Sequence, residues 1–599
     1  MDRSTQSKCQ LGCANSELCK EIGKLPCKSC RMVAYCGISC QQSHWEEHKK
    51  HCKSPLADPN WRPAWQVERR VPTWAQGLVA GVYPDALEGK YEPWGTASAI
   101  DILNLKHNEG VDTTRDFSLL FAGKATINYQ PFDSSRDLRY LVATLASLPS
   151  QSHRLLNITL NDPEIAVVSR NLMLLLVALD ASQPAQDQDQ ANTSRAIDTI
   201  IHFWYSAFLT DDIMLYLEEK IQPLLEQVRD KIHNADFDTV IKHTWNFSGG
   251  SSIQVSLTAQ CWKRVLSSLS IPPGLSYDAA VRRLQEITLD GRKSDYRDRC
   301  YSKMQNRFFR VAKQRFREDG MLLPFGHSRL EFRRPNPSLF VESRGFYYSD
   351  QADPLGGWNI FLSQRTPWVA FNDVYGKLYS FLTDVIGSFL YSLGKNRIAL
   401  SLFNVDIKEL SQHLCNRRYD RIKVTNVCGR EDINILETFQ HFSSHLLYPE
   451  QNRHATIITL FINAAKEYGH LSGDMEECVG IHPLLVWYDT YNAFIASGTE
   501  NPRFQAQMIG TELYPKLEEW FTKLSCLLQF QQNAEFSGMA MKTQNTIVRR
   551  WPMKLPVPIQ DNISIETFRL FYGSEHPLLE RYVEWRWRSP PSQLIRFYN

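Results

Sequence analysis

Apolar and polar positions alternate between two periods along the chain after about residue 94. A strand-like apolar run at 117–122 precedes a segment at 136–148 whose apolar residues recur every three or four positions. A second strand-like run at 155–160 precedes a long apolar helical stretch that begins at Pro163. Strands that alternate with helices at this spacing predict a parallel, doubly wound α/β sheet.

The same alternation returns near the middle of the chain. Strand-like runs occur at 399–405, 421–425 and 455–461, whereas 196–320 is rich in helical patterns and carries no comparable strand signal. We therefore predict one α/β domain with a helical insertion and a helical C-terminal region. The predicted parts are 94–180 and 321–475 for the two halves of the α/β domain, 181–195 for a polar loop, 196–320 for the insertion and 476–599 for the C-terminal region.

The N-terminal segment has a different character, because residues 9–52 are rich in cysteine and too short to bury a core of their own. Residues 53–93, rich in proline and tryptophan, are expected to form a linker that partly packs on the body. The segment 9–52 offers eight soft donors in pairs: Cys9, Cys13, Cys27, Cys30, Cys36, Cys40, His48 and Cys52. Eight such donors match two tetrahedral Zn²⁺ ions, and bound metal would supply much of the folding free energy.

The spacing supports most of these pairs. Cys27 and Cys30 form a Cys-x2-Cys turn, and each of the next two pairs is separated by four residues, one turn of a helix. The first pair is less regular: Cys9 with Cys13 is preferred, and Cys19 is a competing donor expected to stand apart as a small free thiol. His44 and His51 do not fit the spacing, because only His48 lies one turn before Cys52.

This order of donors, together with Tyr35, Gln41 and Trp45, resembles the MYND-type zinc finger over residues 9–52. The resemblance implies an interleaved arrangement in which the first and third pairs bind one zinc ion and the second and fourth pairs bind the other. It also implies a protein-interaction role, with a partner peptide lying near Gln41 and Trp45. The alternative is that both residues only pack within a scaffolding finger.

Charge and composition favour a protein partner in the cytoplasm. The finger holds nine Lys and Arg against five Asp and Glu up to Lys53, so seven zinc-bound thiolates and two zinc ions would leave it near +1. Nucleic-acid binders need a clearer positive excess, and no apolar run predicts a membrane span. Zinc thiolates and six scattered cysteines indicate a reducing compartment, and without a strong basic import signal the cytoplasm leads over the nucleus.

Four segments of the body carry a second resemblance: 101–110, 160–162, 169–171 and 420–426. They resemble a fungal family that joins such a body to a MYND finger and, more distantly, axonemal dynein assembly factors. The resemblance covers about 95–590. It implies a Rossmann-like, methyltransferase-like core without an established reaction.

An enzyme hypothesis follows from strand ends. Asp162 and Asp406 lie just past predicted strands, where methyltransferase-like folds hold the ribose and adenine of S-adenosylmethionine, and Asn426 ends the next strand. The loop after Ala122 carries only Gly123, where a Gly-x-Gly turn would favour cofactor binding. Asp162 before Pro163 also suits a helix N-cap.

The basic stretch 292–334, with interleaved aromatic residues, could stack nucleic-acid bases, but a helix with solvated charges explains it more simply. Two function classes remain. The first is a zinc-containing interaction or scaffold protein, and the alternative is a methyltransferase-like enzyme with a structural finger.

Overall fold

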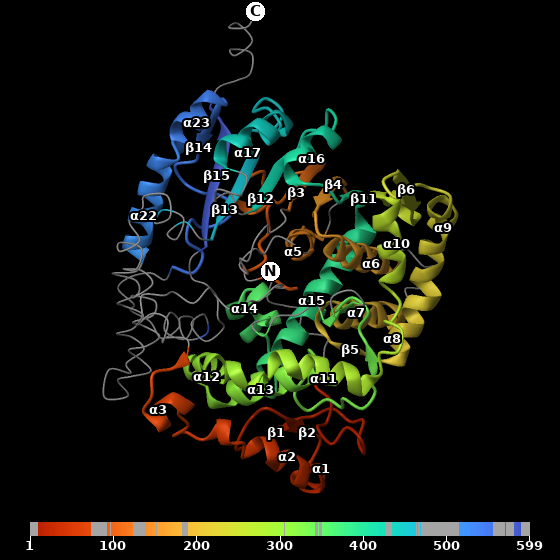
Figure 1. Cartoon of the computed structure of the whole chain (residues 1–599), viewed down its shortest axis with the longest axis vertical. Coiled ribbons are helices and arrows are strands. Elements are labelled where there is room, and N and C mark those ends of the chain that lie inside the picture. The colour runs from red at the N-terminus through yellow and green to blue at the C-terminus, as the bar shows by residue number, and fades with distance from the viewer. Residues whose placement is uncertain are drawn as a thin grey trace, which may run out of the picture.

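The fold is described from a computed structural model. It describes residues 10–73, 93–95, 97–123, 138–150, 153–182, 190–304, 306–341, 352–425, 434–462, 514–554 and 580–588, with a few isolated residues between these ranges. The finger elements lie along the outer side of α11–α13, on the opposite side of the molecule from α16 and α17 (Figure 1).

A nine-stranded mixed sheet forms the centre of the body, in the order β14-β15-β13-β12-β3-β4-β11-β7-β6. Its strands are β3 (Phe117–Ala122), β4 (Leu155–Asn161), β6 (Val240–Asn246), β7 (Ser252–Thr258), β11 (Arg397–Phe403), β12 (Arg421–Thr425), β13 (Thr456–Phe461), β14 (Met539–Met541) and β15 (Arg581–Trp587). The six strands from β13 to β7 run parallel, so the predicted parallel arrangement holds for the middle of the sheet. The antiparallel strands at both ends were not predicted.

Helices alternate with these strands. The longer helices are α5 (Arg139–Ala146), α6 (Ile165–Ala181), α7 (Gln190–Tyr205), α9 (Gln222–His233), α10 (Ala259–Ser267), α11 (Tyr277–Thr288), α12 (Ser294–Lys303), α13 (Arg307–Asp319), α15 (Val374–Lys395), α17 (Ile435–Phe442) and α22 (Tyr514–Leu527). The shorter ones are α8 (Asp211–Tyr216), α14 (Ile360–Gln364), α16 (Ile407–His413) and α23 (Phe530–Phe536). The predicted strands at 117–122 and 421–425 match β3 and β12 residue for residue, and the other three agree to within two residues.

The prediction that 196–320 is almost wholly helical is wrong. This segment contributes the antiparallel hairpin β6–β7, and β7 pairs with β11 in the main sheet. Ile253, Val255 and Leu257 are buried at alternate positions, a strand period that is present in the sequence and that the prediction overlooked. Residues 240–258 of this segment therefore extend the central sheet, whereas 259–319 carry the helices α10–α13.

The C-terminal region is not helical throughout either. After α22 and α23 the chain returns as β14 and β15, and β15 pairs antiparallel with β13. Tyr582, Val583 and Trp585 are fully buried because β15 lies inside the sheet, between β13 and β14. Over 583–587 apolar residues alternate with Glu584 and Arg586, a strand period that the prediction of a helical C-terminal region overlooked.

A buried ionic network holds irregular chain against one face of the sheet. Arg421 of β12 is fully buried, binds both carboxylate oxygens of Glu109 at 2.8 and 2.9 Å, and donates to the carbonyl oxygens of Ile102 and Leu103. Asn452 bridges Glu109 and the neighbouring Asp420. These side chains satisfy backbone groups that a helix would have satisfied internally. The motif segments 101–110 and 420–426 thus meet in a structural network.

Glu584 of β15 serves a second irregular segment in the same way. Its buried carboxylate accepts the backbone N–H groups of Thr546, Ile547 and Val548 at 2.8 to 3.0 Å and pairs with Lys542 at 2.9 Å. Within the described residues, no helix is long and apolar enough to cross a membrane.

Candidate metal centre

Two clusters of cysteine and histidine lie within the finger. The finger consists of the short strands β1 (Leu25–Pro26) and β2 (Ala34–Tyr35) and the helices α1 (Ile38–Ser43) and α2 (Trp45–Cys52). The donor atoms of each cluster all lie within 4.8 Å of one another. The first cluster is Cys13, Cys19, Cys36 and Cys40, and the second is Cys27, Cys30, His48 and Cys52. These two clusters are called cluster 1 and cluster 2 below.

Cluster 1 joins the start of the finger to α1. The Cys36 Sγ lies 3.6 Å from the Cys19 Sγ and 3.4 Å from the Cys40 Sγ, and the backbone N–H of Cys36 points at the Cys13 Sγ at 3.4 Å. The structure differs here from the sequence prediction, because Cys19 is part of the cluster and does not stand apart. A turn at Asn15, which accepts the backbone N–H of Cys19, folds that thiol back toward Cys36. Cys9 lies outside the described residues.

Cluster 2 joins the turn between β1 and β2 to α2. The Cys27 and Cys52 Sγ atoms are 4.0 Å apart, and the Cys30 Sγ lies 3.4 Å from the His48 Nε2. The turn that presents Cys27 and Cys30 is closed by a hydrogen bond from the Arg31 N–H to the Cys27 carbonyl oxygen, with Arg31 in the left-handed region. All four donor residues are buried. The predicted pairing of the second and fourth pairs agrees with this grouping.

The geometry of both clusters suits zinc. A Zn–S bond of about 2.3 Å places tetrahedral thiolates roughly 3.8 Å apart, close to the observed separations. Without a cation the thiols of cluster 1 cannot all ionise easily: Cys40 and Cys19 beside it raise the pKa of Cys36 to about 12, whereas a backbone hydrogen bond at Glu21 lowers the pKa of Cys19. A divalent cation reverses that preference, because zinc binds the thiolate form. Cys₄ and Cys₃His sets are those of closed structural zinc sites.

The finger packs directly on the body beside cluster 2. The Asn372 side chain donates to the Cys30 carbonyl oxygen at 2.8 Å, and its backbone N–H donates to the Arg31 carbonyl oxygen at 2.8 Å. His51 packs edge-on against Phe325, with ring centroids 5.2 Å apart. Sequence reasoning missed Asn372, because nothing near it in the chain marks a contact with a finger more than 300 residues away.

Close contact also extends to the cluster 1 side. A Cβ added to Gly326 would lie 2.8 Å from the Ala14 Cβ and 3.4 Å from the Val33 Cγ1, so the body backbone approaches the finger too closely for a side chain. Next to Gly326, Phe325 donates its backbone N–H to Asp373 at 2.8 Å. Burial raises the pKa of Asp373 to about 6, although the hydrogen bonds from the backbone N–H groups of Phe325 and Gly376 favour its ionised form. Asp373 is also the N-cap of α15, so the finger contact is tied to the central helix of the body.

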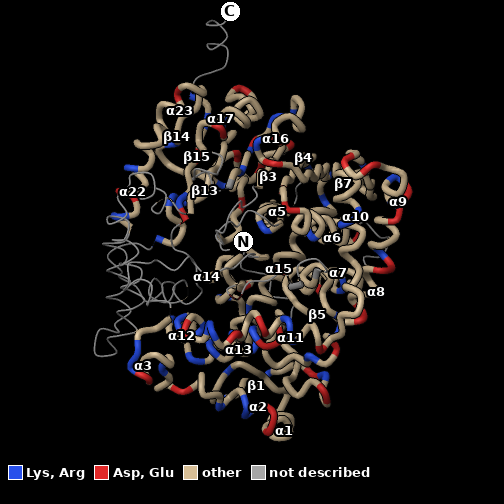
Figure 2. Tube along the Cα trace, in the orientation of Figure 1, with Lys and Arg blue, Asp and Glu red and all other residues tan. Residues whose placement is uncertain are grey.

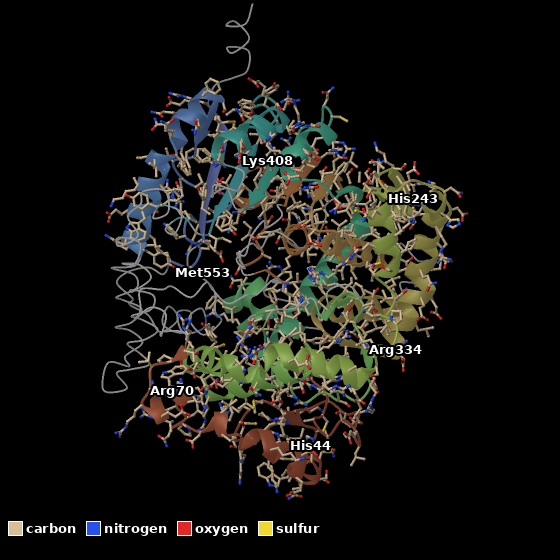
Figure 3. The ribbon with its side chains drawn as sticks, viewed as in Figure 1. His44, Arg70, His243, Arg334, Lys408 and Met553 are labelled. Carbon is tan, nitrogen blue, oxygen red and sulfur yellow. The ribbon has the colours of Figure 1, made fainter. Side chains whose placement is uncertain are left out.

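The segment after the finger runs along α12 and α13. Arg70, which is labelled in Figure 3, forms a bidentate ion pair with the buried Asp295, at 2.5 and 2.6 Å. Arg310 lies over the Trp61 ring, with its guanidinium carbon 4.8 Å from the ring centroid. Basic residues line α12 and α13 in Figure 2, but Arg310 is buried under this segment. Part of the basic stretch therefore packs against residues 55–70.

The predicted peptide-binding residues sit on the two finger helices. Gln41 and Trp45 are half-buried, and the Trp45 ring contacts His48 and lies 5.7 Å from the Lys53 ammonium. His44 and His51 are in neither cluster. His44 contacts the Tyr35 hydroxyl, and His51 packs against Phe325. His44 lies at the outer end of the finger (Figure 3).

At the carboxyl edge of the sheet, polar side chains form hydrogen bonds with backbone groups of neighbouring segments. Asp162 is buried and accepts the backbone N–H of Glu164, the N-cap of α6. Asn161 donates to the Val405 carbonyl oxygen at 3.0 Å, and Asn404 donates to that of Asp162 at 2.8 Å. Because Gly123, just past β3, also donates its backbone N–H to the Asn161 carbonyl oxygen at 2.9 Å, the ends of β3, β4 and β11 are joined by protein contacts.

The other predicted cofactor residues are placed as follows. Asp406 is exposed and caps α16 by accepting the backbone N–H of Lys408 at 2.8 Å. A Cβ on Gly123 would lie 2.6 Å from the Asn161 carbonyl oxygen, so the glycine serves a close strand contact. Asn426 and the loop after Gly123 lie outside the described residues.

Comparison with known families supports the finger. Residues 13–52 match the family model of the MYND finger, which begins and ends at donors of the two clusters. Residues 93–209 match the model of a domain of unknown function (DUF4470). No solved structure matches the chain. The chain thus carries a MYND-type zinc finger beside a mixed α/β body, while the similarity to the fungal family and to dynein assembly factors stays a prediction.

Proposed function

We propose that this chain is a protein-interaction or scaffold protein whose MYND-type finger, held by two zinc ions, recruits a partner peptide. One ion is bound by cluster 1 and the other by cluster 2. The carrying observation is that two complete sets of four soft donors converge inside the segment that matches the MYND model. We assign Cys19 to the place that spacing had given to Cys9, because cluster 1 already offers the four donors of a tetrahedral zinc site with it.

The partner peptide is proposed to lie against Gln41 and Trp45. These residues belong to consecutive helices; α1 also carries Cys40 of cluster 1, and α2 carries His48 and Cys52 of cluster 2. A partly exposed indole held between His48 and Lys53 offers a rigid apolar anchor at low entropic cost. Zinc-bound thiolates require a reducing compartment, which supports the cytoplasm, or the nucleus, as the location.

The test combines zinc content with partner capture. Elemental analysis of the full chain should give two zinc ions, and a pull-down with Trp45→Ala should lose partners that wild type captures while both ions stay. Leu18→Ala is the matched control, since Leu18 is an exposed apolar finger residue, 81% accessible, outside both clusters. Equal capture by wild type and Trp45→Ala would move the binding surface elsewhere.

The second candidate is an S-adenosylmethionine-dependent, methyltransferase-like enzyme with a structural finger. The strand order favours it. If the hairpin β6–β7 beside β11 is set aside and β3, β4, β11, β12, β13, β14 and β15 are numbered one to seven, these seven strands read 3-2-1-4-5-7-6, a doubly wound order with an antiparallel strand inserted near one end. That inserted strand is typical of methyltransferase-like folds. Against the candidate, Asp162 and Asp406 already serve the starts of helices α6 and α16.

Thermal unfolding separates the two candidates. A ligand that binds only the folded state adds about 2.7 kcal/mol at a hundredfold excess over its dissociation constant. We expect S-adenosylmethionine to leave the melting temperature unchanged. A clear upward shift that Asp162→Ala abolishes would establish the enzyme candidate instead.

A further inference from the structure

We propose that cluster 1 is a peroxide-sensitive zinc switch, whereas cluster 2 is a protected structural site. This inference rests on the two-zinc assignment proposed above and adds a regulatory role to one of the two ions. It follows from a difference in burial, in ligand chemistry and in what each ion holds in place.

The two clusters differ in accessibility and in number of thiolates. Cluster 2 has three thiolates and one imidazole, and its Cys30 and His48 are 0% and 2% exposed. Cluster 1 has four thiolates, and three of them, Cys19, Cys36 and Cys40, are only partly buried. Oxidation of thiolates follows their charge and exposure, so an oxidant reaches cluster 1 first.

The sulfur positions favour a disulfide that includes Cys36. Its Sγ lies 3.6 Å from Cys19 and 3.4 Å from Cys40, whereas Cys13 is buried. The step uses one hydrogen peroxide molecule. The Cys36 thiolate attacks one peroxide oxygen, the O–O bond breaks, and hydroxide leaves to give a sulfenic acid. The thiolate of Cys19 or Cys40 then attacks that sulfur, an S–S bond forms, and a second hydroxide leaves.

In balance, two thiolates lose two electrons, the peroxide gains them, and two protons convert both hydroxides to water. The remaining two thiolates cannot complete a tetrahedral site, so Zn²⁺ is released. Thiols restore the site by exchange with the disulfide, after which zinc can bind again.

Loss of this ion would act on the proposed partner surface. Helix α1 has six residues, buries none of them, and has no side-chain N-cap, so a bond of Cys40 to zinc would be a major anchor beside the hydrogen bond from the Asn15 side chain to the Ser43 hydroxyl. So short a helix does not persist alone in water. Gln41 follows Cys40 directly and would lose its position. Trp45 would keep its position, because α2 buries His48 and Cys52 and is held by cluster 2.

The experiment treats the full-length, zinc-loaded chain with hydrogen peroxide and follows zinc release with a chromogenic chelator. We expect one zinc equivalent to leave at least tenfold faster than the second. Peptide mapping by mass spectrometry should then find Cys36 in a disulfide with Cys19 or Cys40, and Cys27, Cys30 and Cys52 still free. Release of both ions together, earlier release from cluster 2, or no disulfide at Cys36 would overturn the proposal.

A variant sharpens the result. Cys36→His keeps four possible zinc ligands but separates the Cys19 and Cys40 thiols from their common neighbour, so peroxide release of the first ion should slow at least fivefold. Should this variant fail to bind zinc, the peptide map of the wild-type chain decides alone. Zinc content before treatment tests the two-zinc assignment independently: two ions with non-selective release would reject only the switch.

Discussion

The finger and the carboxyl edge of the central sheet both gather polar side chains, but in the finger the donor atoms converge on one another, whereas at the sheet edge each side chain pairs with a backbone group. In each finger cluster, four donor atoms lie within 4.8 Å of one another. At the sheet edge, the side chains of Asp162, Asn161 and Asn404 each bind a backbone group of a neighbouring strand or helix. Convergence of like donors, which repel one another when ionised, indicates a ligand, whereas pairing with backbone groups indicates structure.

We expect cluster 2 to contribute more than cluster 1 to the attachment of the finger to the body. Cys30→Ser should reduce zinc content from two ions to one and detach the finger from the body, because Asn372 binds the backbone at Cys30 and Arg31. Structural zinc contributes on the order of 10 kcal/mol to the folding of such small domains. Elemental analysis and hydrogen exchange of α13 would measure both effects.

Cys40→Ser is the matched comparison within the finger. It should also remove one ion, yet leave the exchange protection of α13 intact, because the contacts to the body beside cluster 2 remain. Equal deprotection of α13 by both variants would show that the two clusters are not structurally distinct.

In the body, the largest effect should come from the ionic network at the amino end of β12. Arg421→Met would leave the buried Glu109 without its cation, and breaking a buried pair costs about 3–5 kcal/mol. Denaturant unfolding of the variant measures this loss. Adding Glu109→Gln should recover part of it, and a double variant no more stable than Arg421→Met would argue against coupling between these two residues.

Most of the finger and the middle of the sheet could be predicted from local sequence patterns. Pairs such as Cys27 with Cys30 lie within one turn, so spacing alone brings their donors together. The first pair was harder, since Cys13 and Cys19 meet only through the turn at Asn15. Strand β15 carries a period-two pattern over 583–587, but the run is short and its partner β13 lies more than 100 residues away, so its place in the sheet leaves no local signal. Contacts such as Asn372 with Cys30 join distant segments and leave no local signal.

The docking of the finger can be weakened without touching a donor. Gly326→Ala would place a methyl group 2.8 Å from the Ala14 Cβ, and overpacking of this kind costs about 1–3 kcal/mol. We expect faster hydrogen exchange in 53–73 with both zinc ions retained. Gly12→Ala is the control on the finger side, since nothing lies within 4 Å of the added carbon. Similar exchange in both variants would show that the finger does not depend on this close approach.

The smallest effect distinguishes a helix cap from a cofactor ligand at the sheet edge. Asp406 accepts the backbone N–H of Lys408 at the start of α16, so Asp406→Ala should cost about 1 kcal/mol of unfolding free energy. Asn caps helices about as well as Asp, so Asp406→Asn should stay close to wild type. Denaturant midpoints of the three proteins decide between the roles, measured with and without S-adenosylmethionine. If Asp406 only caps the helix, Asp406→Asn should be as stable as wild type, and S-adenosylmethionine should change neither midpoint. If Asp406 holds the cofactor through its charge, S-adenosylmethionine should stabilise wild type but not Asp406→Asn.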